Sequence, residues 1–187
     1  KIKKFKHNDN IHSLVFQKDL EALKKKKKKK ELTIRELCLY YLTRVKKYQE
    51  YNSIIELDPG LLAQGELLDE KIAKGEAGSL AGVVILLKDN IASKKLHTSA
   101  GSYALRELTT RRNALIGDQL EKEDALIMGK SNLSEFANFM TFPSSNGFSV
   151  LGGQTKNPYG KFDVGGSSSG SCVAEALGLA NICLGTE

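Results

Sequence analysis

Residues 82–90 read Gly-Val-Val-Ile-Leu-Leu-Lys-Asp-Asn, and the rest of the fold is built around this stretch. Residues 83–87 are continuously apolar and partly β-branched, which is typical of a strand buried on both faces of a sheet. Lys88 follows at the carboxyl end of this strand, where ligand-binding and catalytic groups gather. Burial removes the hydration of a lysine and lowers its pKa, so Lys88 is a candidate proton acceptor near neutral pH.

A second unusual stretch, residues 165–171, reads Gly-Gly-Ser-Ser-Ser-Gly-Ser. Hydroxyl groups between glycines, on a backbone free to adopt positive φ, suit a binding site better than a core. Residues 172–180 are small and apolar and predict a helix, so the serines should lie near a helix N-terminus. Unpaired N–H groups there attract negative charge, and we therefore expect chemistry on an oxyanion.

Two common motifs share the spacing of this loop, and the chain disfavours both. A phosphate-binding loop needs a lysine after its second glycine, where this chain has Ser171. An α/β-hydrolase needs a histidine after its nucleophile, but His7, His12 and His97 all precede Ser168. A serine site with a lysine base remains.

Together these stretches resemble the amidase signature family, serine hydrolases that cleave carboxamides with a Ser-cisSer-Lys triad. Within that family, their sequence is most similar to the peptide amidase branch. The resemblance implies an α/β fold, with a mixed β-sheet covered by helices and incomplete at the C-terminus. Residues 1–187 would form the N-terminal portion of a single amidase domain, with 1–31 as a basic leading segment. The blocks that carry the resemblance are residues 82–90, 98–102, 128–139, 152–159 and 165–171.

The resemblance also implies roles for individual residues. Lys88 matches the family's general base, and Ser167 matches the middle serine, which has a cis peptide bond and relays the proton. The family's nucleophilic serine follows a block that begins like residues 184–187, so we expect the nucleophile beyond Glu187. We expect Asn138, Ser168 and Ser169 to contribute to substrate binding.

Other residues compete for these roles. Lys130 ends a second apolar run, residues 125–128, and from its position alone it could rival Lys88 as the base. Phe136, Phe139 and Phe142 have helical spacing, which favours packing in the core over a pocket around Asn138.

The flanking sequence predicts further helices and a short strand. Thr33 and Glu36 form a capping-box pattern at the start of a helix over residues 33–48. We expect a strand over 53–57, a helix over 61–74 that ends at Gly75, and a helix over 118–123. Glu175 should face solvent, or else its carboxylate disturbs the helix behind the serine loop.

Charge and cysteine content restrict the class of protein. The formal charge of +6 includes seven consecutive lysines at positions 24–30, and such a block is usually solvated. No aromatic residues interleave with these lysines, so we expect no specific nucleic-acid partner. No apolar run approaches the length of a membrane span, and no secretory signal is evident. The three cysteines, of which Cys38 and Cys183 are expected in the core and Cys172 beside the loop, lack metal spacing and predict a reduced, cytoplasmic protein.

The favoured function is therefore hydrolysis of a small-molecule or peptide amide to acid and ammonia, without a metal or another cofactor. One alternative is a catalytically inactive truncated fragment or pseudogene product. Another is the amidase subunit of a tRNA-dependent amidotransferase, which we rank last because the amino-acid sequence of residues 132–138 and 152–157 is less similar to that branch.

Overall fold

A four-stranded mixed sheet forms the centre of the computed structural model, which describes residues 11, 12, 15, 32–140 and 145–187. The strand order is β1-β3-β2-β6; β2 runs parallel to β3 and β6, and β1 is antiparallel to β3. The predicted α/β class with a mixed sheet is confirmed. The strands are β1 (Ile54–Leu57), β2 (Val84–Lys88), β3 (Leu126–Ser131) and β6 (Ile182–Leu184).

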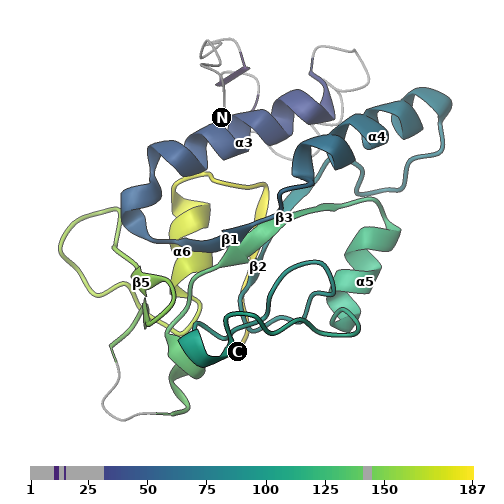
Figure 1. Ribbon diagram of the computed structural model, residues 1–187. Coiled ribbons are helices and arrows are strands. Elements are labelled where there is room, and N and C mark those ends of the chain that lie inside the picture. Colours follow the sequence, from purple (N-terminus) through teal and green to yellow (C-terminus); the bar gives the residue numbers. More distant parts are fainter. Residues whose placement is uncertain (1–10, 13–14, 16–31, 141–144) are drawn as a thin grey trace.

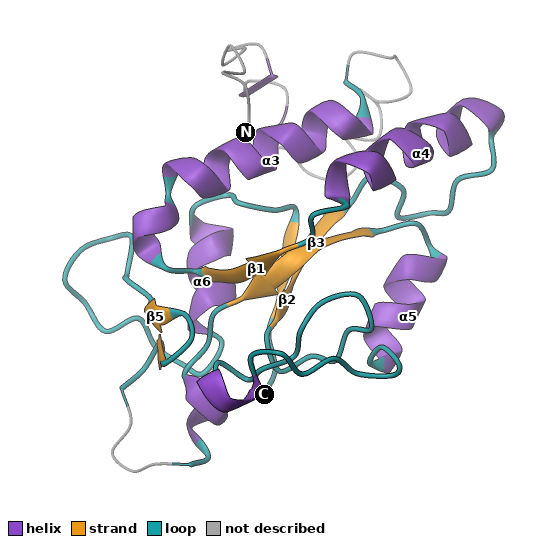
Figure 2. Cartoon of the chain, in the orientation of Figure 1, coloured by secondary structure: helices purple, strands orange, loops and turns teal. Residues whose placement is uncertain are grey.

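Helices cover both faces of the sheet (Figures 1 and 2). On one face, α3 (Ile34–Lys47), α4 (Leu61–Lys74) and α6 (Ser169–Ala176) pack around Val84 and Leu86 of β2. On the other face, α5 (Leu115–Lys122) and the segment after β2 pack around Val83, Ile85 and Leu87. All five residues of β2 are buried, as the apolar run predicts.

The remaining elements are short. They are the 3₁₀ helices η1 (Gln49–Tyr51), η2 (Tyr103–Leu105) and η3 (Glu135–Asn138), and a two-stranded ribbon of β4 (Phe148–Ser149) and β5 (Gly153–Gln154). The predicted ends of the long helices are close to the observed ones. Thr33 and Glu36 form the capping box of α3, and α4 ends at Gly75, whose φ is 75°.

A bulge in β3 decides which face of the sheet its last residues reach. Ile127 pairs with Ile85, but the next pair is Gly129 with Leu86, so Met128 is an extra residue in β3. Beyond the bulge, Lys130 pairs with Leu87 and Ser131 pairs with Lys88. Paired residues share a face, so Lys130 lies on the α5 face and Lys88 lies on the α6 face.

Helix α6 begins earlier and ends earlier than the sequence predicts. It includes Ser169 and stops at Ala176, because Gly178 adopts a φ of 60°. Arg44 of α3 is only 6% exposed and fixes this end, since it donates hydrogen bonds to the carbonyls of Leu177 and, at 2.9 Å, Gly178. Glu175 is exposed, so its carboxylate does not disturb the core.

The prediction that Phe136, Phe139 and Phe142 pack in the core is wrong for Phe139, which is exposed. Residues 135–138 form a single 3₁₀ turn in which Phe136 and Ala137 have φ values of 47° and 54°, so the spacing does not define a helix face. Phe136 is half-buried and Phe139 is 90% exposed. Phe142 lies outside the described residues.

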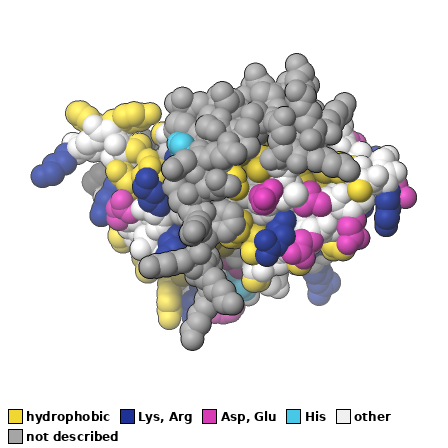
Figure 3. All heavy atoms as spheres, turned by 90° about the horizontal axis from the view of Figure 1, so that it is seen from above, with side chains coloured by type: hydrophobic (Ala, Val, Ile, Leu, Met, Phe, Trp, Pro, Cys, Tyr) yellow, Lys and Arg dark blue, Asp and Glu magenta, His cyan; other side chains and the backbone are white. Residues whose placement is uncertain are grey.

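The helical face of the molecule carries acidic and basic side chains side by side where described atoms are visible (Figure 3). Arg35 of α3 and Glu66 of α4 form an ion pair between these two helices, with Nε and Oε1 2.5 Å apart. The lysine tract at 24–30 and most of the predicted leading segment 1–31 lie outside the described residues. Among the described helices, none is long and apolar enough to cross a membrane.

Candidate active site

Three parallel strands end at the same edge of the sheet, and the candidate site lies there. Strands β2, β3 and β6 bring their carboxyl ends together, and the first turn of α6 lies beside them. Polar residues follow each strand at this edge, because the apolar pattern stops where the strand leaves the core. Lys88 ends β2, Ser131 ends β3 and Thr186 follows β6.

Lys88 is completely buried and its Nζ is surrounded by hydroxyl groups. Nζ lies 2.6 Å from Ser167 Oγ, 2.9 Å from Thr186 Oγ1 and 3.0 Å from Ser168 Oγ. Among the described residues, no carboxylate forms a salt bridge with Lys88. The structure therefore brings the two sequence-predicted residues, Lys88 and Ser167, into direct contact.

Burial lowers the pKa of Lys88, and Glu187 and Cys172 oppose this shift only in part. The partners of Nζ matter as well. A hydroxyl can both accept and donate, so Ser167 can donate a hydrogen bond to a neutral amine or accept one from an ammonium. The site can thus hold Lys88 in either protonation state without leaving a polar group unpaired.

The serine loop is held by contacts on both sides. The peptide bond between Gly166 and Ser167 is cis, as the resemblance implies. The Ser134 N–H donates to the carbonyl of Ser167 at 3.0 Å, and the Gly170 N–H donates to the carbonyl of Asn132 at 3.0 Å. A Cβ on Gly170 would lie 2.3 Å from that same carbonyl oxygen, so only glycine permits α6 to approach the end of β3 this closely.

Lys130, the competing lysine, has a different environment. Its Nζ donates to the carbonyls of Ile91 at 2.7 Å and His97 at 3.0 Å, and Asp89 Oδ1 lies 3.7 Å away. Burial lowers the pKa of Lys130, while the Asp89 carboxylate opposes that shift. Because its partners are predominantly acceptors, a neutral amine would point its lone pair at another lone pair. Lys130 is therefore suited to be a buried cation and not a base.

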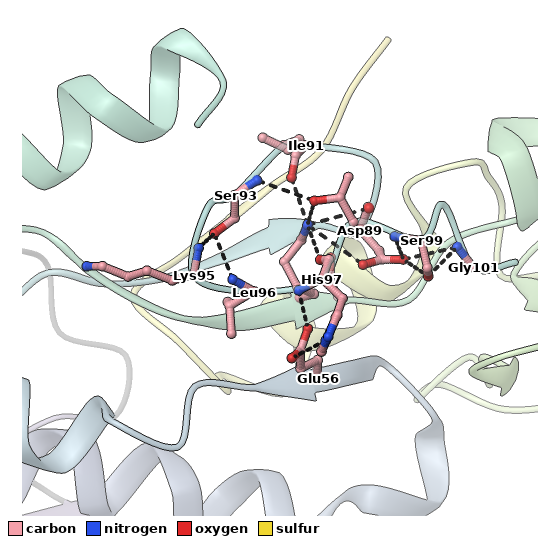
Figure 4. A network of polar contacts seen from close by, with 12 residues as sticks. Glu56, Asp89, Ile91, Ser93, Lys95, Leu96, His97, Ser99 and Gly101 are labelled. Atoms are coloured by element: carbon pink, nitrogen blue, oxygen red, sulfur yellow. Dashed lines mark hydrogen bonds and ion pairs between the residues drawn. The ribbon is translucent and has the colours of Figure 1, made fainter. Parts of the chain in front are cut away.

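Further polar contacts hold the segment after β2, and Figure 4 shows them around Asp89, His97 and Glu56. Asp89 Oδ2 accepts hydrogen bonds from Ser99 Oγ and from the N–H groups of Ser99, at 3.2 Å, and Gly101, at 3.0 Å. On the other side, Glu56 of β1 accepts from the N–H of His97 at 2.9 Å and lies 2.9 Å from His97 Nδ1.

The three residues predicted to bind substrate occupy different positions. Ser168, the N-cap residue of α6, contacts Lys88 and also bonds to the backbone of Thr186. Ser169 is 1% exposed and donates to the carbonyl of Gly165, so its hydroxyl shapes the loop. Asn138 donates to Asn146 Oδ1 at 3.2 Å, and that oxygen lies close to Gly166 of the serine loop. Substrate contact by these residues stays a prediction.

Two residues of the site were missed in the sequence. Thr186 Oγ1 accepts from Lys88 and, at 3.1 Å, from Asn90 Nδ2. Asn132 is fully buried; its Nδ2 lies within 3.1 Å of three acceptors, while its Oδ1 accepts from Ser149 at 2.7 Å. A polar residue directly after a buried strand was the available signal for Asn132, which follows β3, whereas Gly185 separates Thr186 from the partly buried β6.

The described residues contain no cluster of three or more His, Cys, Asp or Glu side chains arranged to hold a metal ion. A cavity of about 800 Å³ lies between η1 and the loop that follows β5. Its lining includes Tyr51 and Lys156, and it reaches the serine loop at Asp163, whose Oδ1 accepts a hydrogen bond from the Gly165 N–H at 2.6 Å.

Comparison with known proteins places this geometry in context. A family model described as Amidase matches residues 36–187. A probable amidase of Arabidopsis thaliana is 40% identical over 164 residues, which are 84% of this chain and 32% of the plant protein. A glutamyl-tRNA(Gln) amidotransferase subunit of Coxiella burnetii is 37% identical over 176 residues, 92% of this chain and 35% of that protein.

The solved structures to which this chain is similar are also amidases. The native peptide amidase of Stenotrophomonas maltophilia superposes with a TM-score of 0.89 at 38% identity, over 92% of this chain and 36% of that chain. An amidase family protein of Bacillus anthracis has a TM-score of 0.92 at 33% identity, over 100% of this chain and 39% of that chain. The chain thus spans between 32% and 39% of the length of these four relatives.

Proposed function

The chain belongs to the amidase family, and on this premise we propose that the protein containing it hydrolyses the C–N bond of carboxamides with a Ser-cisSer-Lys triad. Lys88 is the general base and Ser167 relays the proton. The nucleophilic serine comes from the residues that follow Glu187 in the complete protein. The observation that carries this proposal is the 2.6 Å contact between Lys88 Nζ and Ser167 Oγ, within a site where the lysine has hydroxyl partners and no described carboxylate.

The reaction begins with neutral Lys88. The nucleophilic serine attacks the carbonyl carbon and passes its proton to Ser167 Oγ, while Ser167 passes its own proton to Lys88 Nζ. Backbone N–H groups stabilise the tetrahedral oxyanion. When the intermediate collapses, Lys88 returns the proton through Ser167 to the leaving nitrogen, and ammonia departs.

Hydrolysis of the acyl-enzyme uses the same relay. Water attacks the ester carbonyl and gives a proton to Ser167, which again protonates Lys88. The proton returns to the nucleophilic serine as the carboxylic acid leaves. The protein regains its starting protonation state, so no external acid or base is consumed.

We further propose that the substrate is a peptide amide or a small carboxamide. The likeness to a peptide amidase, at 38% identity and a TM-score of 0.89, supports this class. None of Cys38, Cys172 and Cys183 forms a disulfide bond, which supports a reducing compartment such as the cytoplasm.

A second candidate function is the amidase subunit of a tRNA-dependent amidotransferase. The 37% identity over 176 residues with such a protein favours it. That function would need a partner protein to receive ammonia, whereas a peptide amidase would act alone.

The test begins with the coding sequence beyond Glu187, where the proposal predicts a serine shortly downstream. The complete protein is then incubated with peptide amides, aryl amides and glutamine, and ammonia release is measured. Release from a peptide amide without a partner supports the proposal. Release from glutamine only when a partner and charged tRNA are present supports the amidotransferase function, and no release from any substrate rejects both.

A further inference from the structure

Lys130 fills neither role that the mechanism needs, base or relay, yet it is among the most completely buried charged groups of the described chain. It is 0% exposed and lies on the α5 face, opposite to Lys88. Burying a cation is costly unless its surroundings satisfy it. The surroundings in this case are the main chain of the segment that follows the catalytic lysine.

The segment of residues 89–101 has no regular secondary structure, so its own backbone does not fix its path. Lys130 Nζ gathers acceptors from several points along it: the carbonyls of Asp89 at 3.5 Å, Ile91 at 2.7 Å and His97 at 3.0 Å, and Thr98 Oγ1 at 3.3 Å. One ammonium group therefore closes the segment into a loop, in which Asp89, Ile91 and His97 are labelled in Figure 4.

This loop is tied directly to the backbone of Lys88. The N–H of Ile91 donates to the carbonyl of Lys88 at 2.9 Å, and the N–H of Asp89 donates to the carbonyl of Ser131 at 3.1 Å. The Asp89 side chain is clamped between Lys130 on one oxygen and the N–H groups of Ser99 and Gly101 on the other. The backbone on the C-terminal side of Lys88 is thus bonded to the end of β3 and to the loop, and Lys130 contacts that loop.

We propose that Lys130 is a positioning residue for the amidase reaction, whose buried ammonium holds the 89–101 segment in place and thereby fixes the direction in which Lys88 points at Ser167. This inference rests on the proposed function. Lys130 touches neither Lys88 Nζ nor the serine loop, so its effect on the reaction is exerted through Asp89 and the backbone of β2.

The first measurement uses the complete protein with Lys130→Met, which keeps most of the length of the side chain and removes the charge. Displacing a catalytic group by about 1 Å can cost about 100-fold in rate, so we expect kcat to fall by about 100-fold with KM almost unchanged. Lys130→Arg keeps a cation with several donors and should restore part of kcat. Lys71→Met is the matched control, since it removes another lysine–aspartate pair, with Asp124, at a half-exposed position.

The pH profile separates positioning from a general loss of stability. If the end of β2 loosens, water reaches Lys88, its pKa rises towards the ordinary value, and the acidic limb of the kcat/KM profile moves to higher pH. A purely structural role would lower the amount of active protein and leave the limb where it is. An unshifted limb together with an unchanged kcat overturns the inference.

Hydrogen exchange tests the same inference without activity. Lys130→Met should speed amide exchange in residues 89–101 and leave α3 unchanged, while Lys71→Met should alter neither. If Lys130→Met does not fold, Thr98→Val decides, because it removes one acceptor of Lys130 at nearly constant shape and should give smaller shifts in the same directions. A wild-type protein that cleaves no amide refutes the proposed function alone, whereas unchanged exchange in residues 89–101 refutes the role of Lys130.

Discussion

Lys88 Nζ and Ser167 Oγ lie 2.6 Å apart although 79 positions separate the two residues in the chain. The contact joins the end of a buried strand to the loop that starts α6, and both elements are anchored in the same core cluster. The conformational entropy of the two side chains is therefore lost during folding and not at each turnover. Such preorganisation is what a proton relay requires, because proton transfer depends steeply on donor–acceptor geometry.

Replacing Lys88 by arginine should strongly slow amide hydrolysis even though the positive charge is kept. Arginine stays protonated at any pH at which the protein is folded, so it can bind Ser167 but cannot accept its proton. We expect kcat of the complete protein to fall by about 10²- to 10⁴-fold, the usual contribution of a general base. Ammonia release from the preferred amide measures this. A variant that keeps more than half of the wild-type rate would exclude Lys88 as the base.

The stability of the fold should depend on pH through Lys88. Burial lowers its pKa in the folded chain, whereas an unfolded lysine titrates near about 10.4. Between these two values the unfolded state binds more protons, so the free energy of unfolding rises with pH across that window. Below the lowered pKa the cost of a buried ammonium is fully present.

Lys88→Met removes this titration and provides the comparison. The free energy of unfolding of the wild type, minus that of the variant, should decrease as the pH falls from about 10.4 to the lowered pKa, and it should stay constant below that pKa. Urea unfolding at a series of pH values measures the difference. A difference that stays constant with pH would show that Lys88 has the same pKa in the folded and unfolded states.

The sequence predicts the elements that carry the site better than it predicts their mutual arrangement. The strand before Lys88 could be recognised because five consecutive apolar residues have few alternatives to a doubly buried strand. The face on which Lys130 lies could not, since it depends on a bulge at Met128 that leaves no mark in an apolar run. Likewise, the phenylalanine spacing predicted a helix because nothing local indicates the positive φ values at Phe136 and Ala137.

Gly170→Ala should destabilise the protein although it adds a better helix former to α6. The new Cβ would lie 2.3 Å from the carbonyl oxygen of Asn132 and 2.5 Å from that of Ser53, and neither backbone can move without disturbing the sheet edge. We expect a loss of about 3 kcal/mol, the upper end for overpacked sites. Gly75→Ala is the control, because nothing lies within 4 Å there and only its φ of 75° opposes the change, at about 1 kcal/mol. Equal losses in thermal or urea unfolding would contradict the close approach.

Arg44→Met should weaken the attachment of α6 to α3. The guanidinium is buried and bonds to the last carbonyls after α6, and hydrogen bonds to a charged group contribute about 1.5–3 kcal/mol. Arg35→Met removes a contact to Glu66 between two exposed side chains and should cost less than about 1 kcal/mol. Both variants lose a guanidinium group, but Arg44 is buried against backbone carbonyls whereas Arg35 is exposed beside a carboxylate. A similar melting temperature for both would show that Arg44 does not hold the helix.

The two neighbouring serines that contact Lys88 should respond differently to alanine. Ser167 relays the proton in the proposed mechanism, so Ser167→Ala should lower kcat by about 10²- to 10⁴-fold. Ser168 also accepts from Lys88, at 3.0 Å, but its other bonds, both 3.2 Å long, go to the backbone N–H and carbonyl of Thr186. Its loss removes neutral hydrogen bonds of about 1 kcal/mol each and should lower kcat by roughly tenfold.

Steady-state kinetics of both variants, with melting temperatures as a check on folding, distinguish a relay from a support. The acidic limb of the pH profile should persist in Ser168→Ala, because Lys88 must still be neutral to accept the proton of Ser167 in this variant. If Ser168→Ala loses as much activity as Ser167→Ala while both remain folded, the proton passes through both hydroxyls or through Ser168 alone. The assignment of the relay to Ser167 would then be wrong, even though its oxygen lies nearer to Lys88 Nζ.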